Sequence, residues 1–158
     1  MKYRKFYTVS LFGNRFVCAK DKVGETLYNY LKTRIGNKCV RVLIGTHGDF
    51  DKISFSVCRR LKREGYNIHI ILVYTSYKRL QKEMQETGVA WDYRDIETML
   101  YEIEEVYYKR QIIVSNQKMV DESDEIIVYY DGRNQIYSGT YRVIRYAKKN
   151  NKTIVNIF

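Results

Sequence analysis

Glycine and polar residues gather where apolar runs of the sequence end. The densest group extends from Gly45 to Asp51 and includes His47, Gly48 and Asp49. Two glycines three positions apart let backbone N–H groups come close to a ligand such as a phosphate. A carboxylate there can accept a hydrogen bond from a ribose hydroxyl, and the histidine can contact a base or a phosphate. The segment fits equally well a plain turn whose aspartate caps the next helix.

Two further groups have similar chemistry. Residues 13–15 form a predicted tight turn with Arg15 at its tip, where it can pair with a phosphate or remain an ordinary surface arginine. Residues 138–140 (Ser-Gly-Thr) open a predicted helix. Free amides, the positive end of the helix dipole and two hydroxyls favour an anion there, and a simple serine cap is the alternative.

The apolar pattern predicts the elements that position these groups. Unbroken apolar runs, typical of strands buried on both faces, occur at 8–12, 40–44, 68–74, 125–130 and 153–158. Helical periodicity predicts helices at 21–35, 51–64, 108–121 and 138–149, with a short polar helix at 76–86 and a short strand near 98–103. This alternation predicts one α/β domain over residues 1–158, with a Rossmann-like, mostly parallel sheet and helices on both faces.

Particular residues are expected to end these elements. Asp21 and Asp51 are predicted to cap the first two long helices, and Gly36 and Gly65 to stop them. Asp124 is given a structural role at the start of its strand.

Ligands of an open parallel sheet bind outside the carboxyl ends of its strands, near the point where the strand order reverses. The polar groups fall at those ends. The predicted ligand-binding residues are Gly13, Asn14, Arg15, Gly45, Thr46, His47, Gly48, Asp49, Asp51, Tyr74, Asn116, Asp131, Ser138, Gly139 and Thr140. If the protein is an enzyme, Asp49 and Asp51 are its candidate catalytic residues.

Composition narrows the classes of partner. Apolar residues make up 45% of the 158 residues and charged residues 29%, as expected of a globular domain. The formal net charge of +10 suits nucleic acid, an anionic small molecule or simply a solvated surface. Three cysteines without a C-x-x-C spacing favour a reducing cytoplasm over a disulfide framework or zinc site. No signal peptide, membrane segment, metal site or cofactor is predicted.

Four segments in order carry a resemblance to a known family. They are 12–15 (Phe-Gly-Asn-Arg), 44–51 (Ile-Gly-Thr-His-Gly-Asp-Phe-Asp), 115–124 (Ser-Asn-Gln-Lys-Met-Val-Asp-Glu-Ser-Asp) and 138–149, which opens Ser-Gly-Thr and ends Tyr-Ala-Lys-Lys. Together they resemble the SLOG superfamily, above all its YpsA-like branch of small bacterial proteins. The resemblance covers nearly the whole chain and is weakest over 76–110. It implies a Rossmann-like fold and a pocket for nucleotides or nucleotide-derived molecules such as ADP-ribose.

The resemblance also implies roles for single residues. Gly13 and Arg15 match the family's first turn, and its second turn is matched by Gly45, Gly48 and Asp51. Asn116 matches the family's polar helix position. Gly139 and Thr140 match its phosphate-side turn. Ser115 stands where the family usually has arginine. The related cytokinin-activating phosphoribohydrolases carry a catalytic glutamate shortly after their glycine-rich loop. Here residues 141–143 are Tyr-Arg-Val, so cleavage of an N-glycosidic bond by that route lacks its key residue.

Three functions follow as alternatives. The favoured one is binding of a nucleotide or NAD-derived, ADP-ribose-like molecule, as a sensor or as a sponge that sequesters a signalling nucleotide in bacterial or phage defence. The second is an enzyme acting on an N-glycosidic bond, as a nucleoside or nucleotide hydrolase or like a deoxyribosyltransferase. The third is nucleic-acid binding, although the lysines and arginines are scattered along the chain. Relatives commonly form dimers or tetramers, so a homo-oligomer is expected.

Overall fold

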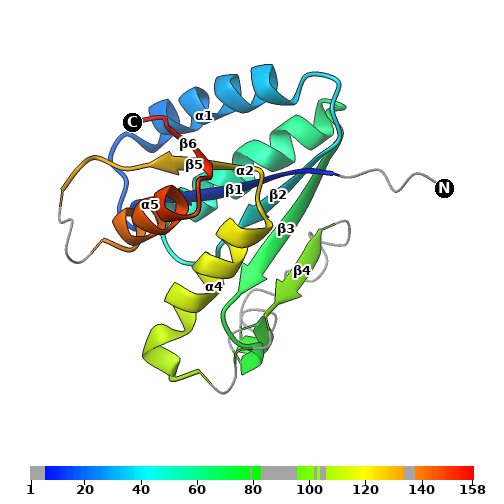
Figure 1. Ribbon diagram of the computed structural model, residues 1–158. Helices are drawn as coiled ribbons and strands as arrows, with labels where there is room; N and C mark the ends of the chain where they lie inside the picture. The colour runs from blue at the N-terminus through cyan, green and yellow to red at the C-terminus, as the bar shows by residue number, and fades with distance from the viewer. Residues whose placement is uncertain (1–5, 79, 83–95, 102, 104–105, 134–137) are drawn as a thin grey trace.

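One sheet of six parallel strands forms the centre of the molecule (Figure 1). The computed structural model describes residues 6–78, 80–82, 96–101, 103, 106–133 and 138–158. The strands are β1 (Tyr7–Gly13), β2 (Val40–Ile44), β3 (Ile68–Tyr74), β4 (Glu97–Leu100), β5 (Glu125–Tyr129) and β6 (Thr153–Asn156). Their order in the sheet is β4-β3-β2-β1-β5-β6. The predicted Rossmann-like α/β fold is therefore confirmed.

Helices cover both faces of the sheet. On one face α1 (Lys20–Ile35) packs beside α2 (Asp49–Arg63), and on the other α4 (Tyr108–Glu122) packs beside α5 (Gly139–Lys149) (Figure 1). Between β3 and β4 the backbone is helical at 77–78 and 80–82, within the predicted short helix. In the described part of the chain, no helix combines the length and apolar character needed to cross a bilayer.

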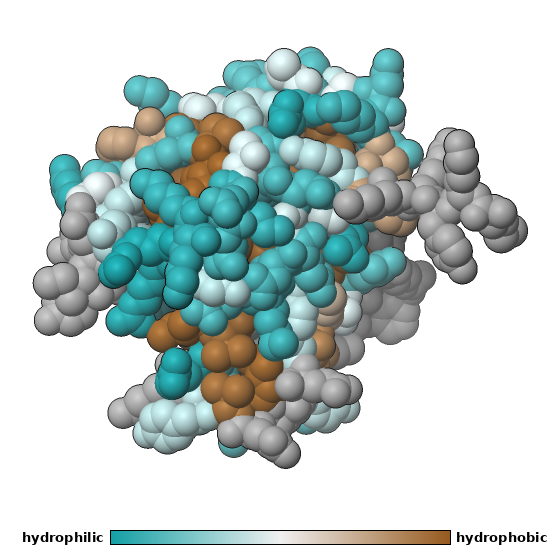
Figure 2. Space-filling view, in the orientation of Figure 1, coloured by the Kyte–Doolittle hydropathy of each residue, from teal (hydrophilic) through white to brown (hydrophobic). Residues whose placement is uncertain are grey.

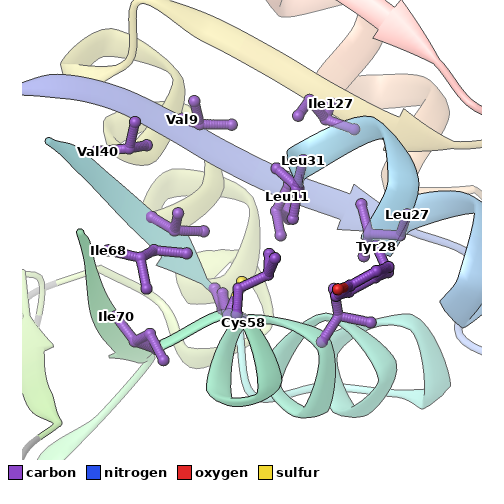
Figure 3. Close-up of a cluster of buried hydrophobic side chains, with 14 of the residues drawn as sticks. Val9, Leu11, Leu27, Tyr28, Leu31, Val40, Cys58, Ile68, Ile70 and Ile127 are labelled. Atoms are coloured by element: carbon purple, nitrogen blue, oxygen red, sulfur yellow. The ribbon is translucent and has the colours of Figure 1, made fainter. Parts of the chain in front are cut away.

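Two apolar clusters fill the space between sheet and helices. Leu11 of β1 belongs to the cluster under α1 and α2 (Figure 3), and its neighbour Phe12 to the cluster under α4 and α5. Successive side chains of a strand point to opposite faces. A strand covered on both faces is therefore apolar at most of its positions, which is why the sequence shows long apolar runs.

The predicted cap of α1 is wrong, whereas its predicted stop is confirmed. Asp21 lies inside the first turn, and the residue before the helix is Ala19, in the left-handed conformation and without a side-chain cap. An acidic side chain in the first turn still interacts favourably with the helix dipole. The aspartate therefore marks the start of the helix, but it lies two residues after the capping position. Gly36 ends the helix with a φ of 49° and donates its N–H to the Lys32 carbonyl.

The predicted cap of α2 is also wrong. The helix starts at Asp49, two residues earlier than expected, because Gly48 reverses the chain with a φ of 107°. The Asp51 carboxylate instead accepts a hydrogen bond from the His47 N–H. Gly65, with a φ of 94°, lies just past the end of the helix as predicted.

The strand order reverses at β1. From β1 the chain moves outward through β2, β3 and β4, and then returns to place β5 on the other side of β1. The β1–α1 loop therefore leads to one face of the sheet and the β5–α5 loop to the other. In folds of this kind ligands bind in a crevice between two adjacent loops that diverge in this way, and the strand order places that crevice between the β1–α1 and β5–α5 loops.

Candidate functional site

The loops that follow β1 and β2 are joined by Asp49. Its backbone N–H donates to the Arg15 carbonyl at 2.8 Å, and its carboxylate accepts from the Val17 N–H at 3.0 Å. Lys20 Nζ lies 3.5 Å from the same carboxylate. The Val17 hydrogen bond is the main reason that the pKa of Asp49 is lowered, with Lys20 adding to it against partial desolvation. This carboxylate therefore holds the two loops together and is itself held in its ionised form.

Asp51 organises the second loop in a similar way. Its carboxylate accepts from the His47 N–H at 2.7 Å and lies 3.0 Å from the point where a Cβ of Gly45 would stand. His47 Nε2 lies 3.4 Å from Thr75 Oγ1, which connects the loop to the end of β3. Thr46 makes a second such connection by donating its hydroxyl to the Val73 carbonyl at 3.4 Å.

Three of the predicted site glycines are explained by packing inside the protein. A Cβ on Gly13 would stand 2.2 Å from the Phe50 ring, and one on Gly48 would stand 2.9 Å from the Arg15 Cα. As described above, the Asp51 carboxylate occupies the space beside Gly45. Gly139 differs: it is exposed, and apart from its chain neighbours and the backbone of α5, no atom of the described residues lies within 4 Å of its Cβ position. At Gly139 the missing side chain leaves open surface beside the backbone.

The loop after β5 lies next to the loop after β1. The Asn14 N–H donates to the Tyr129 carbonyl at 3.1 Å. Asp131 accepts from the Arg133 N–H at 2.9 Å, and the Tyr130 hydroxyl donates to the Arg133 carbonyl at 3.2 Å. Asp131 therefore shapes a turn beside the crevice, and Arg133 is exposed on that turn.

The first turn of α5 borders the same region. Ser138 Oγ accepts from the Tyr141 N–H at 3.1 Å, so the serine acts as the helix cap. Thr140 is only 6% exposed and Ser138 is half-buried, so Gly139 is the most accessible residue of the predicted trio. The ring centroids of Tyr130 and Tyr141 are 6.0 Å apart, and this contact packs the turn against the end of β5.

Asn116 and Gly139 line one narrow hollow between α4 and α5, together with Arg142. The hollow has a volume of about 40 Å³, too small for a whole nucleotide. Figure 2 shows apolar side chains gathered over α4, where Ile112 is 41% exposed. Tyr74 lies elsewhere: it is 5% exposed and packs in the core under α1 and α2.

Three arginines lie in the loops after β1 and β5 and in the first turn of α5. Arg15, Arg133 and Arg142 are all exposed, and no carboxylate of the described residues pairs with any of them. Only Arg15 was predicted. Arg142 lies on the solvent side of an amphipathic helix and Arg133 in a turn, positions at which a sequence gives no sign of a role.

A larger hollow of about 390 Å³ lies at the C-terminal end of α1, lined by Tyr30, Arg34 and Lys38 among others. It is at the opposite edge of the sheet, beside the buried Glu125. That carboxylate accepts from the Tyr7 hydroxyl at 2.8 Å, the Tyr30 hydroxyl at 2.8 Å and Arg34 Nε at 2.9 Å. The polar groups there satisfy one another, so this hollow is the weaker candidate.

Among the described residues, no group of three or more histidine, cysteine, aspartate or glutamate side chains is placed to hold a metal ion. A comparison of the chain with protein-family models found no match, and neither did a comparison with curated proteins.

Proposed function

We propose that the protein binds a nucleotide-type phosphorylated molecule, such as the NAD-derived ADP-ribose, at the crevice where the strand order reverses. The observation that carries this proposal is that Arg15, Arg133 and Arg142, which lie in the loops after β1 and β5 and in the first turn of α5, are exposed and have no carboxylate partner among the described residues. Arginine forms bidentate hydrogen bonds with phosphate, and the accessible first turn of α5 adds backbone N–H groups and a favourable dipole. The family resemblance leads to the same class of ligand.

The contacts of the two aspartates favour binding without turnover. Asp49 and Asp51 each accept a backbone N–H, from Val17 and His47. A carboxylate with a lowered pKa is a poor proton donor, and one engaged by loop amides is poorly placed to attack a sugar carbon. The protein would then act as a sensor or as a sponge for the nucleotide.

The first experiment is thermal denaturation of the purified protein with ADP-ribose, cyclic ADP-ribose isomers, NAD and AMP, each followed by chromatography of the ligand. A ligand at about a hundred times its Kd adds about 2.7 kcal/mol of stability. We expect stabilisation by at least one of these nucleotides and its recovery intact. Stabilisation accompanied by product would make the protein an enzyme, and the absence of any shift would contradict the proposal.

Gly139→Asp gives a sharper test, because it separates folding from binding. The Cβ of the new side chain has open space around it, and a carboxylate in the first turn of a helix stabilises the helix by about 0.3–1 kcal/mol. The same charge repels a phosphate at that turn. We expect ADP-ribose binding to be lost while the urea midpoint stays the same or rises. Gly139→Ala is the matched control and should keep binding; an unchanged Kd in Gly139→Asp would place the phosphate elsewhere.

A further inference from the structure

Phe16 is exposed to a degree that its surroundings do not require. It lies in the loop between β1 and α1, and 82% of its surface is exposed. The next residue, Val17, is 6% exposed and belongs to the core under α1 and α2. The smaller apolar side chain is therefore buried and the larger one is left in water, the reverse of what the hydrophobic effect alone would select.

Hydrogen bonds on both sides of Phe16 impose this arrangement. The Arg15 carbonyl accepts from the Asp49 N–H at 2.8 Å, and the Val17 N–H donates to the Asp49 carboxylate at 3.0 Å. Gly48 packs directly against the Arg15 backbone. Shifting the loop by one residue, which would bury Phe16, would break both hydrogen bonds. The start of α2 thus holds the ring in its exposed position.

The Phe16 ring belongs to one of the two loops between which the crevice is placed. Phe16 follows Arg15 and lies two residues beyond Asn14, whose N–H bonds to the last residue of β5. Among the described residues no aromatic or cationic side chain stacks on Phe16. Phe16 therefore lies on a fixed backbone at the edge where the strand order reverses, and its neighbour Arg15 has no ion pair within the described part of the chain.

From this arrangement we propose that Phe16 is the base-stacking residue of the site: the planar heterocyclic base of the ligand lies on its ring, while Arg15 pairs with a phosphate. The inference rests on the proposed function and extends it to the part of the ligand that determines specificity. Aromatic rings stack on any nucleobase, so this contact selects a nucleotide over a sugar phosphate without selecting one base.

Isothermal titration with AMP and with ribose 5-phosphate tests the assignment, because the two probes share a ribose and a phosphate and differ in the base. We expect the wild type to bind AMP more tightly. Phe16→Ala should weaken AMP binding about 5- to 150-fold, the range for loss of one stacked base, and leave ribose 5-phosphate unaffected. Phe16→Tyr keeps a ring and should restore AMP binding. Phe6→Ala, a change of the 40% exposed phenylalanine at the other end of β1, is the control.

The outcomes separate this inference from the function on which it rests. If the wild type binds AMP and Phe16→Ala binds it equally well, or loses both probes to the same extent, the stacking role is overturned and the proposed function stands. If the wild type binds neither these probes nor ADP-ribose, both are overturned. If Phe16→Ala leaves both affinities unchanged and lowers the mass in sedimentation, the ring is a contact between copies of the chain instead.

Discussion

The Phe50 side chain leaves no room for a side chain at position 13. The Phe50 ring, 1% exposed, lies where a side chain of residue 13 would stand, and it stacks on Tyr129 with ring centroids 5.8 Å apart. A glycine at the end of β1 is thus needed to seat an aromatic side chain of α2. At this position the requirement comes from packing and holds whether or not a ligand approaches.

Replacing this glycine should therefore cost stability. Gly13→Ala places a methyl carbon 2.2 Å from the nearest carbon of the Phe50 ring, and overpacking of this kind costs about 1–3 kcal/mol. Urea denaturation measures the loss. Gly139→Ala, at an open position, should stay within about 0.5 kcal/mol of the wild type. Equal midpoints for the two variants would show that Phe50 moves aside freely.

The lowered pKa of Asp49 predicts that the free energy of unfolding depends on pH in the acid range. Its pKa is lowered in the folded protein from the ordinary value of 3.8, so the carboxylate stabilises the fold at and above that pH. The contribution is lost as the pH falls through the lowered pKa. We expect Asp49→Asn to be less stable than the wild type at pH 7, and the difference to narrow as the pH falls below about 3.8.

Urea midpoints measured at several pH values between 7 and 2.5 would follow this difference. Asp21→Asn is the matched control, because Asp21 lies in the first turn of α1 and makes no hydrogen bond to either loop. A difference between wild type and Asp49→Asn that is the same at every pH would rule out a titrating Asp49 as its cause.

At the scale of elements, Glu125 fastens the end of α1 to the sheet. The side chain opens β5, is 1% exposed, and accepts hydrogen bonds from β1 through Tyr7 and from α1 through Tyr30 and Arg34. Burial by itself raises the pKa of a carboxyl group, but the Arg34, Tyr7 and Tyr30 hydrogen bonds outweigh it and the pKa of Glu125 is lowered. One carboxylate thus joins three elements that are distant in sequence.

Glu125→Gln should loosen this junction. The amide of glutamine has no charge to pair with Arg34. It also replaces one of the two carboxylate oxygens, which accept hydrogen bonds from Tyr7, Tyr30 and Arg34, with an NH₂ group that can only donate. A buried hydrogen-bonding group left unsatisfied costs about 1–3 kcal/mol, measurable as a lower urea midpoint. Glu122→Gln, which breaks the more exposed pair with Arg41, should cost less than about 1 kcal/mol. A Glu125→Gln effect no larger than the control would refute the anchoring role.

Across the whole molecule, tyrosines with raised pKa values recur on both faces of the sheet. Burial, followed by the bond to Glu125, raises the pKa of Tyr30 to about 12 and also raises that of Tyr7. Burial raises the pKa of Tyr101, and a hydrogen bond to Asp121 raises that of Tyr146. The folded chain therefore keeps protons that the unfolded chain releases near pH 10.

This difference predicts unfolding in alkali. The stabilisation is complete below the ordinary tyrosine pKa of 10.0 and is lost as the pH rises toward 12, because the unfolded state binds fewer protons in that window. We expect the urea midpoint to fall steadily between pH 10 and 12. The urea midpoint of Tyr30→Phe should fall less steeply over the same range. Ultraviolet titration of this variant should show one late-ionising tyrosine fewer than the wild type. A midpoint unchanged up to pH 12 would contradict this assignment.

The sequence by itself determined the elements and their order. Periodicity of apolar residues is local, so the strands, the four long helices and the glycines that end α1 and α2 could be predicted from it. The parallel sheet followed from the unbroken apolar runs. The loops at the carboxyl edge followed in turn, because every strand of a parallel sheet ends at that edge.

Tertiary structure alone decided what each loop residue does. Asp49 bonds to Val17 across 32 positions of the chain, and Gly13 makes room for a side chain of α2. The same contacts expose Phe16, and the turn after β5 presents Arg133. A residue type gives the chemistry that a side chain can perform. Contacts between distant segments decide whether that chemistry is used within the fold or left free for a ligand.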